Sequence, residues 1–153
     1  MIRTDAEYRR ALQRLAQEDE TLRAQREHLA SLDLSDEEVE RAMQPLLSFR
    51  AQPAEEVEAY TQMKRGDLGP LQSLTAIGRW LVGARIARGL SQAALAERLG
   101  VHESQVSRDE RNDYRGVTAE RAQRILEALD VRFTAEAESL LDGDAEYVSS
   151  AGA

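Results

Sequence analysis

The stretch SQAALAERLGVHESQVSRDER, residues 91–111, constrains the fold more than any other part of the chain. Its first half repeats apolar residues at helical spacing, and those expected to face a core are Leu95, Ala96 and Leu99. Gly100 follows, the residue type that commonly ends a helix in the left-handed conformation. A second helix is expected over 103–112, anchored by Val106. Two short helices joined by so tight a turn predict a helix-turn-helix.

Further apolar patterns place this pair inside a larger helical unit. A helix from Leu71 to about Arg88 precedes the pair, another begins after Thr118, and a last one is expected from Phe133 to Leu141. The side chains expected to face the core of the flanking helices are Leu74, Ile77, Leu81, Ala84, Ile86, Ala122, Ile125, Leu126 and Leu129. The low aromatic content, 5% against 42% hydrophobic residues, also favours an all-α fold over a sheet.

Two capping boxes mark helices in the N-terminal half of the chain. Thr4 is followed by Glu7 at capping-box spacing, and Ser35 is followed by Glu38 in the same way. The first of these helices is expected to end near Leu32. Together they predict a helical hairpin or coiled-coil extension that precedes the five-helix domain.

The first helix carries apolar residues at alternating intervals of four and three and then of seven, which is the spacing of a coiled-coil seam. These residues are Tyr8, Leu12, Leu15, Leu22 and Leu29. The intervening seam positions are the charged Asp19 and Arg26, which favours a hairpin or short bundle over a long parallel coiled coil.

The second helix carries an apolar face and two prolines. Its apolar residues are Val39, Met43, Leu46 and Leu47. Pro45 interrupts the pattern, and Pro53 fits the first turn of a new helix over 53–65. Residues 36–65 are therefore expected to form either one kinked helix or two helices.

Residues 65–70, RGDLGP, form the best linker in the chain, because two glycines and a proline fall within six residues. We therefore expect an acidic N-terminal helical region over 1–68 and a helix-turn-helix domain over 69–142. The small, polar residues 143–153 are expected to form a disordered tail.

Charge is unevenly distributed along this chain of net charge −8. Residues 1–70 carry a net −5 and residues 134–153 another −5, whereas residues 71–133 carry +2. An acidic protein can bind DNA through a locally basic face, and the sign in the middle segment is the right one. All basic residues but Lys64 are arginine, which can bind phosphate and guanine edges bidentately.

Several classes of site are disfavoured by composition. The chain has no cysteine and only two histidines, so we expect no disulfide, no metal site and no cofactor. His102 is expected to cap a helix rather than bind a metal. No nucleophile–base set or phosphate loop is recognisable, so an enzyme is the least expected class. The absence of an apolar signal core or membrane-length apolar run predicts a soluble, cytoplasmic and nucleoid-associated protein.

The segment RIARGLSQAALAERLGVHESQVSRDER, followed by TAERAQRILEALDV, resembles the Xre (phage-repressor-like) helix-turn-helix family over about residues 74–131. The residues that carry the resemblance are Leu90, Ser91, Gln92, Leu95, Ala96, Leu99, Gly100, Val101, Val106, Ser107, Arg108 and Glu110. The resemblance implies sequence-specific binding to double-stranded DNA, usually by a homodimer on a palindromic operator.

The resemblance also assigns roles to residues. It implies that Gln92 contacts phosphate and braces the recognition helix, and that Glu103, Ser104 and Ser107 occupy the base-reading face, with Arg108 within reach of a guanine or a phosphate. The full predicted DNA-binding set is Ser91, Gln92, His102, Glu103, Ser104, Gln105, Ser107, Arg108, Arg111, Asn112 and Arg115.

Two residues depart from the family pattern. Glu103 places a carboxylate where DNA approaches; it could accept from a cytosine amino group or repel phosphate. Asp109 stands where the family often carries an aromatic residue. The alternating charges of SRDER therefore predict modest non-specific affinity for DNA.

A transcriptional regulator, most simply an autoregulatory repressor, is the leading interpretation. The N-terminal helices could form the dimer interface, bind a toxin as in an HigA-like antitoxin, recruit transcription machinery as in a multiprotein bridging factor, or pack only within the chain. The residues predicted for a dimer or partner interface are Tyr8, Leu12, Leu15, Leu22, Leu29, Val39, Met43 and Leu46. The sequence leaves the operator, the target genes, any effector and the sign of regulation open.

Overall fold

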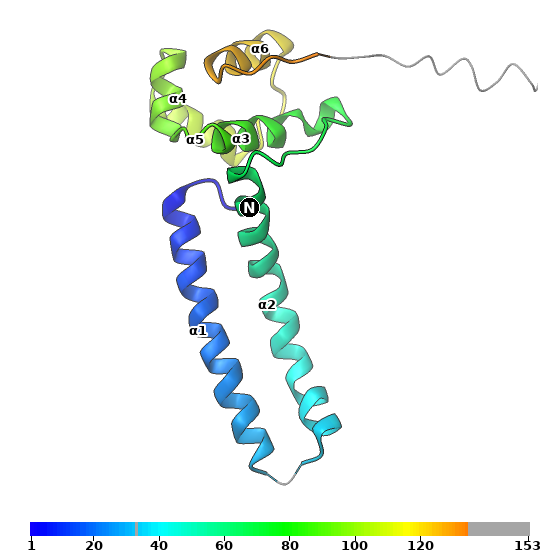
Figure 1. Ribbon diagram of the computed structural model, residues 1–153. Helices are drawn as coiled ribbons and strands as arrows, with labels where there is room; N and C mark the ends of the chain where they lie inside the picture. The colour runs from blue at the N-terminus through cyan, green and yellow to red at the C-terminus, as the bar shows by residue number, and fades with distance from the viewer. Residues whose placement is uncertain (33, 135–153) are drawn as a thin grey trace, which may run out of the picture.

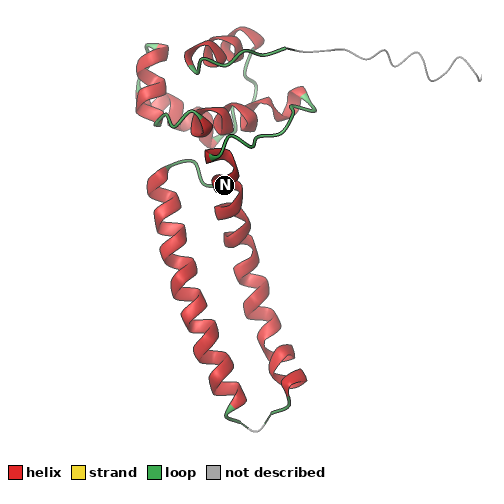
Figure 2. Cartoon of the chain, in the orientation of Figure 1, coloured by secondary structure: helices red, strands yellow, loops and turns green. Residues whose placement is uncertain are grey.

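The structure is a computed structural model, and it describes residues 1–32 and 34–134. Within these residues all regular structure is helical, as Figure 2 shows, so the predicted all-α class is confirmed. Two long helices form a hairpin, and a cluster of short helices lies at the end of the hairpin opposite its turn (Figure 1).

The hairpin consists of α1, Asp5–Ala30, and α2, Asp36–Lys64, packed along their length. Both predicted capping boxes are present: the Thr4 and Ser35 side chains accept from backbone amides, and Glu7 and Glu38 reach back to the cap residues. Helix α1 ends two residues before the expected Leu32. The capping boxes therefore fix where both helices begin.

Helix α2 is continuous through both prolines, which settles the alternative that the sequence left open. Pro45 deprives the Arg41 carbonyl of its helical donor, but both residues are exposed, so water can replace the lost bond. Pro53 lies half-buried within the same helix and does not begin a new one. The linker predicted at residues 65–70 is non-helical, and the non-helical chain continues to residue 73.

The short helices are η1, Leu74–Ala76, then α3, Ile77–Ala87, α4, Gln92–Leu99, α5, Glu103–Arg111, and α6, Ala119–Ala128. The prediction that a helix begins near Leu71 with Leu74 inward is wrong, because Leu74 is 75% exposed. The Ser73 hydroxyl accepts from the Thr75 amide and starts a 3-10 turn there, which leaves the Leu74 side chain in solvent.

The helix predicted from Phe133 to Leu141 lies mostly outside the described residues, as does the tail predicted over 143–153. Within the described part, Phe133 and Thr134 are non-helical. The structure thus describes four of the five predicted α-helices of this domain, with η1 in addition.

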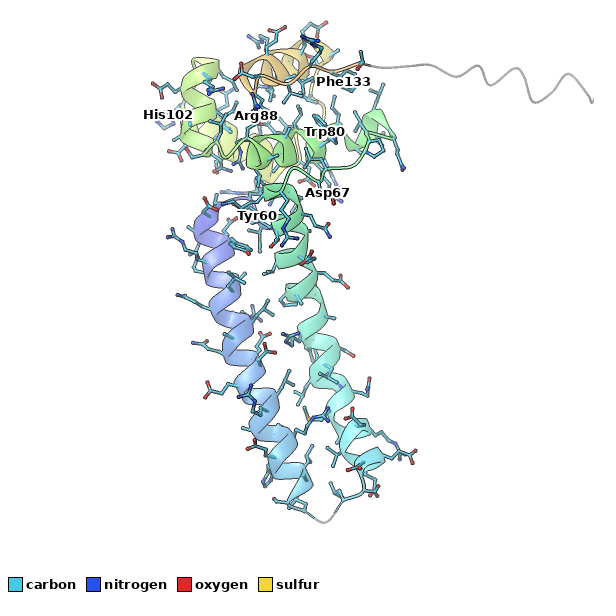
Figure 3. The ribbon with its side chains drawn as sticks, viewed as in Figure 1. Tyr60, Asp67, Trp80, Arg88, His102 and Phe133 are labelled. Atoms are coloured by element: carbon cyan, nitrogen blue, oxygen red, sulfur yellow. The ribbon has the colours of Figure 1, made fainter. Side chains whose placement is uncertain are left out.

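One apolar core joins the hairpin end to the short helices. Ile2 and Tyr60 are buried in the same cluster as Leu81, Val82 and the apolar face of α6. Tyr8 stacks on Tyr60 with ring centroids 4.9 Å apart, and Figure 3 labels Tyr60 at this junction. The hairpin is therefore anchored to the helix-turn-helix by packing as well as by the chain connection.

Candidate nucleic-acid interface

The turn between α4 and α5 has the geometry that the sequence predicts. Ser91 caps α4 by accepting from the Ala94 amide, and Gly100 ends α4 with φ +66°, in the left-handed region. The next helix begins after His102, whose side chain accepts from the Ser104 amide. His102 is thus a helix cap, as expected. These local bonds set α5 across α4 with only three residues between the two helices.

Helix α5 has one buried and one exposed side. Val106 and Glu110 are buried, at 1% and 0% exposure. Because each residue advances about 100° around a helix, the positions opposite this pair are Ser104, Arg108 and Arg111, all of which are exposed. Gln105 and Ser107 flank this stripe and are half-buried. The outward stripe of α5 therefore carries two arginines and no acid.

A buried charged network holds α5 from behind. The Arg85 Nε and Nη2 atoms donate to the two Glu110 carboxylate oxygens at 2.5 and 2.7 Å. Gln92 Nε2 donates to the Glu110 Oε2 atom at 2.8 Å. Arg85 also donates to the carbonyls of Leu90 at 2.7 Å and Arg3 at 2.8 Å. One buried guanidinium thus connects α5 to α3, to the chain before α4 and to the N-terminal segment.

The other acids of α5 also have defined positions. The Asp109 carboxylate accepts from Arg121 on α6 at 2.5 Å, so its charge is offset by an arginine. Glu103 is exposed and lines a hollow of about 240 Å³ together with Asp5, Gln92 and residues of α2. The charges of SRDER alternate along the sequence but not on the surface of the helix. Asp109 and Glu110 pair with arginines of other helices, whereas Arg108 and Arg111 are exposed.

The loop after α5 is held in a strained shape. Asp113 and Tyr114 have φ of +49° and +50°, which is uncommon for residues with a side chain. The Asp113 carboxylate accepts from Arg3 at 2.8 Å and Arg79 at 3.1 Å. Burial raises the pKa of Asp113, but these two hydrogen bonds outweigh burial and hold the pKa below its usual value of 3.8.

Close packing underlies this loop. A Cβ added to Gly78 of α3 would lie 1.8 Å from the Asp113 carbonyl oxygen, so α3 can approach the loop only because residue 78 is glycine. The approach fixes the loop that carries Asn112 and Arg115, both of which are exposed. Asn112 is the C-cap of α5, and Arg115 lies four residues beyond the last residue of the helix.

The predicted DNA-binding residues therefore gather on α4, α5 and the loop after α5. Of the predicted set, Gln92 points inward to Glu110, and Ser91 and His102 are used as caps. Sequence reasoning did not single out Arg85, Arg3 and Asp113. Arg85 could have been found, because it is the only charged residue between Trp80 and Ala87 in an otherwise apolar helix.

The residues predicted for a dimer or partner interface lie mostly between the two helices of one hairpin. Leu15, Val39 and Met43 are buried there, Tyr8, Leu22 and Leu29 are half-buried, and Leu12 and Leu46 are each 41% exposed. The apolar residues at coiled-coil spacing in α1 therefore pack mainly against α2 of the same chain. A contact of these residues with a second chain stays a prediction.

Other kinds of site are not evident in the part of the chain that the structure describes. It contains no group of three or more histidines, aspartates or glutamates arranged to hold a metal ion. None of its helices is long and apolar enough to cross a membrane.

A short helix, a glycine turn and a second helix with an exposed basic stripe define a DNA-binding helix-turn-helix domain. Residues 83–135 match the family model described as helix-turn-helix, which confirms the resemblance to the Xre, phage-repressor-like proteins. The matched segment includes α4, α5 and α6 and lies entirely outside the hairpin. No curated protein and no solved structure matches the chain.

Proposed function

We propose that the chain is a sequence-specific transcriptional regulator, most simply a repressor of its own promoter, that binds a palindromic operator as a dimer. The observation that carries the proposal is the outward stripe of α5, Ser104, Arg108 and Arg111, backed by the buried Arg85–Glu110 pair. A rigid helix with a small polar residue and two arginines on its free side fits the major groove, which is about 12 Å wide.

Each side chain then has a distinct task. Arg108, at the centre of the stripe, reads a guanine edge through two hydrogen bonds. Ser104 is small and lets the start of α5 approach the bases. Arg111 and Arg115 bind phosphates at one side of the groove, and the backbone amides at the start of α4, near Gln92, bind phosphate at the other. Gln92 also positions α5 through Glu110.

Gel retardation on the DNA upstream of the gene tests this proposal. Arg108→Ala should cost about 1–3 kcal/mol of specific binding, whereas its effect on random DNA should be smaller. Arg41→Ala is the matched control, since it removes an exposed arginine from the hairpin. Equal losses for the two variants, or unaltered operator affinity for Arg108→Ala, would remove Arg108 from the base-reading set.

A second candidate, an HigA-like antitoxin, is favoured by the acidity of the hairpin region, which has net charge −5 over residues 1–70. Its N-terminal helices would bind a basic toxin while the helix-turn-helix represses the operon. The test is a neighbouring reading frame that encodes a small basic protein. That frame should arrest growth when expressed alone and should be neutralised by this chain; no toxicity would exclude the antitoxin.

A further inference from the structure

The hairpin carries an exposed aromatic residue beside a hollow that has both apolar and charged walls. Phe49 on α2 is 81% exposed, the most exposed of the large apolar side chains that the structure describes. It borders a hollow of about 530 Å³ between the two helices, whose apolar walls include Ala11 of α1, Pro53 of α2 and the buried Ile2. An exposed ring and a partly apolar hollow thus share one face of the hairpin.

Charges on the two sides of this hollow are opposite. Arg10 and Arg14 line it from α1, and Glu56 lines it from α2. Glu56 is 38% exposed in its side chain and contacts the N-terminal amino group at 3.1 Å. Arg14 is 71% exposed and pairs with Glu18 within α1. Such exposed pairs are weak, so both sides can exchange partners at little cost.

We propose that a second copy of this chain docks on this face. A two-fold axis parallel to the hairpin places α1 of one copy against α2 of the other at the same height. Phe49 of each copy then enters the hollow of the other, and Arg10 and Arg14 of each copy face Glu56 of the other. Each ring thus lies in a hollow, and each positively charged side faces a negatively charged side. The two-fold axis repeats both contacts, as a self-complementary interface requires.

The same arrangement suits DNA binding. An axis parallel to the hairpin keeps both helix-turn-helix units at one end of the dimer, because in each copy they lie at the end of the hairpin away from its turn (Figure 1). The inference rests on the dimer of the proposed function and identifies the surface that forms it. That surface differs from the coiled-coil seam, which is occupied within each chain.

Sedimentation velocity tests the surface directly. The full chain should sediment as a dimer, and Phe49→Glu as a monomer with unchanged far-ultraviolet circular dichroism, since an 81% exposed side chain adds little to the fold of one chain. Leu74→Glu is the matched control: Leu74 is 75% exposed but lies in η1, and the variant should remain dimeric. A monomeric wild type, a dimeric Phe49→Glu or a monomeric Leu74→Glu would each overturn the proposal.

A charge exchange tests the pairing of α1 with α2. Arg10→Glu alone and Glu56→Arg alone should each weaken their homodimer at least several-fold, because each places like charges opposite one another. Mixing the two variants should restore a heterodimer, in which both pairs are again opposite in sign. Unweakened homodimers, or no recovery on mixing, would contradict the arrangement.

Gel retardation separates this inference from the proposed function. Phe49→Glu should keep weak binding to a single half-site and lose the tight complex on the full operator. If the wild-type chain is a dimer, Phe49→Glu is a monomer and the wild-type chain binds no specific DNA, the proposed dimer surface is supported and the proposed regulatory function is wrong. If the wild-type chain binds one operator while Phe49→Glu stays dimeric, the proposed regulatory function is supported and the proposed dimer surface is wrong.

Discussion

Breaking the buried pair between Arg85 and Glu110 should destabilise the chain far more than its two charges suggest. Arg85 is 3% exposed and Glu110 is 0% exposed, and each would leave a charge without a partner if the other were removed. The cost of breaking such a pair is about 3–5 kcal/mol. Small domains have roughly 5–15 kcal/mol of stability, so either single change consumes a large share of it.

The expected loss of unfolding free energy depends on which buried groups each variant leaves without a partner. Glu110→Leu leaves the Arg85 guanidinium without an opposite charge and the Gln92 amide without its acceptor. Arg85→Met leaves the Glu110 carboxylate with the Gln92 amide but without an opposite charge. The double variant Arg85→Met/Glu110→Leu removes both charges and should cost much less than the two single costs added together. It still frees the carbonyls of Leu90 and Arg3, so some loss should remain.

Urea unfolding followed by circular dichroism at 222 nm measures all three variants, provided the slope with denaturant is unchanged. Arg41→Met is the control: its partner Glu37 is 85% exposed, and the change should cost less than about 0.5 kcal/mol. Single variants that lose under 1 kcal/mol, or a double variant that loses the full sum, would refute the view that Arg85 and Glu110 form one coupled unit.

Three further predictions concern the surroundings of α5. Gly78→Ala should destabilise by about 3 kcal/mol in urea unfolding, because its Cβ would lie 1.8 Å from a backbone oxygen, whereas a Cβ at Gly83 would meet only side chains, the nearest atom being the end of Leu68 at 2.8 Å, and should cost far less; equal costs would contradict the packing. Asp113 has a pKa below that of the unfolded chain, so its ion pairs should stabilise the fold above about pH 4 and cease to do so as pH falls through the lowered value; the difference in unfolding free energy between wild type and Asp113→Asn should therefore shrink from pH 7 to pH 3, and a constant difference would argue against it. Arg121→Met should weaken DNA binding in a gel-retardation titration more than Arg124→Met, because only Arg121 pairs with Asp109 of α5; equal weakening would mean that Asp109 is not a source of repulsion.

The sequence predicted best what short-range hydrogen bonds decide. Thr4, Ser35, Ser91 and His102 each cap a helix through a bond to a backbone amide two or three residues away, and such bonds depend on little else. Gly100 is similar, because its left-handed φ is a local preference. The helix-turn-helix could therefore be located from residues 91–111 alone.

The contacts that could not be predicted from the sequence are those between residues far apart in the chain. Apolar spacing in α1 shows which side is apolar, but not whether α2 or a second chain covers it. Arg85 contacts Arg3, 82 residues away, and nothing in either neighbourhood indicates the contact. Glu103, Asp109 and Glu110 look alike in sequence, yet one is exposed, one pairs with α6 and one is buried. Charge counting alone therefore underestimated how basic the outward side of α5 is.

Selection of bound sequences from random DNA shows directly whether α5 reads DNA sequence. The salt concentration must be stated, since affinity for DNA depends steeply on salt. We predict one enriched sequence with two inverted half-sites whose centres lie about 34 Å apart. For Arg108→Ala we predict loss of preference at one base pair in each half-site. A selected pool no different from the starting pool would contradict the claim that α5 reads DNA sequence.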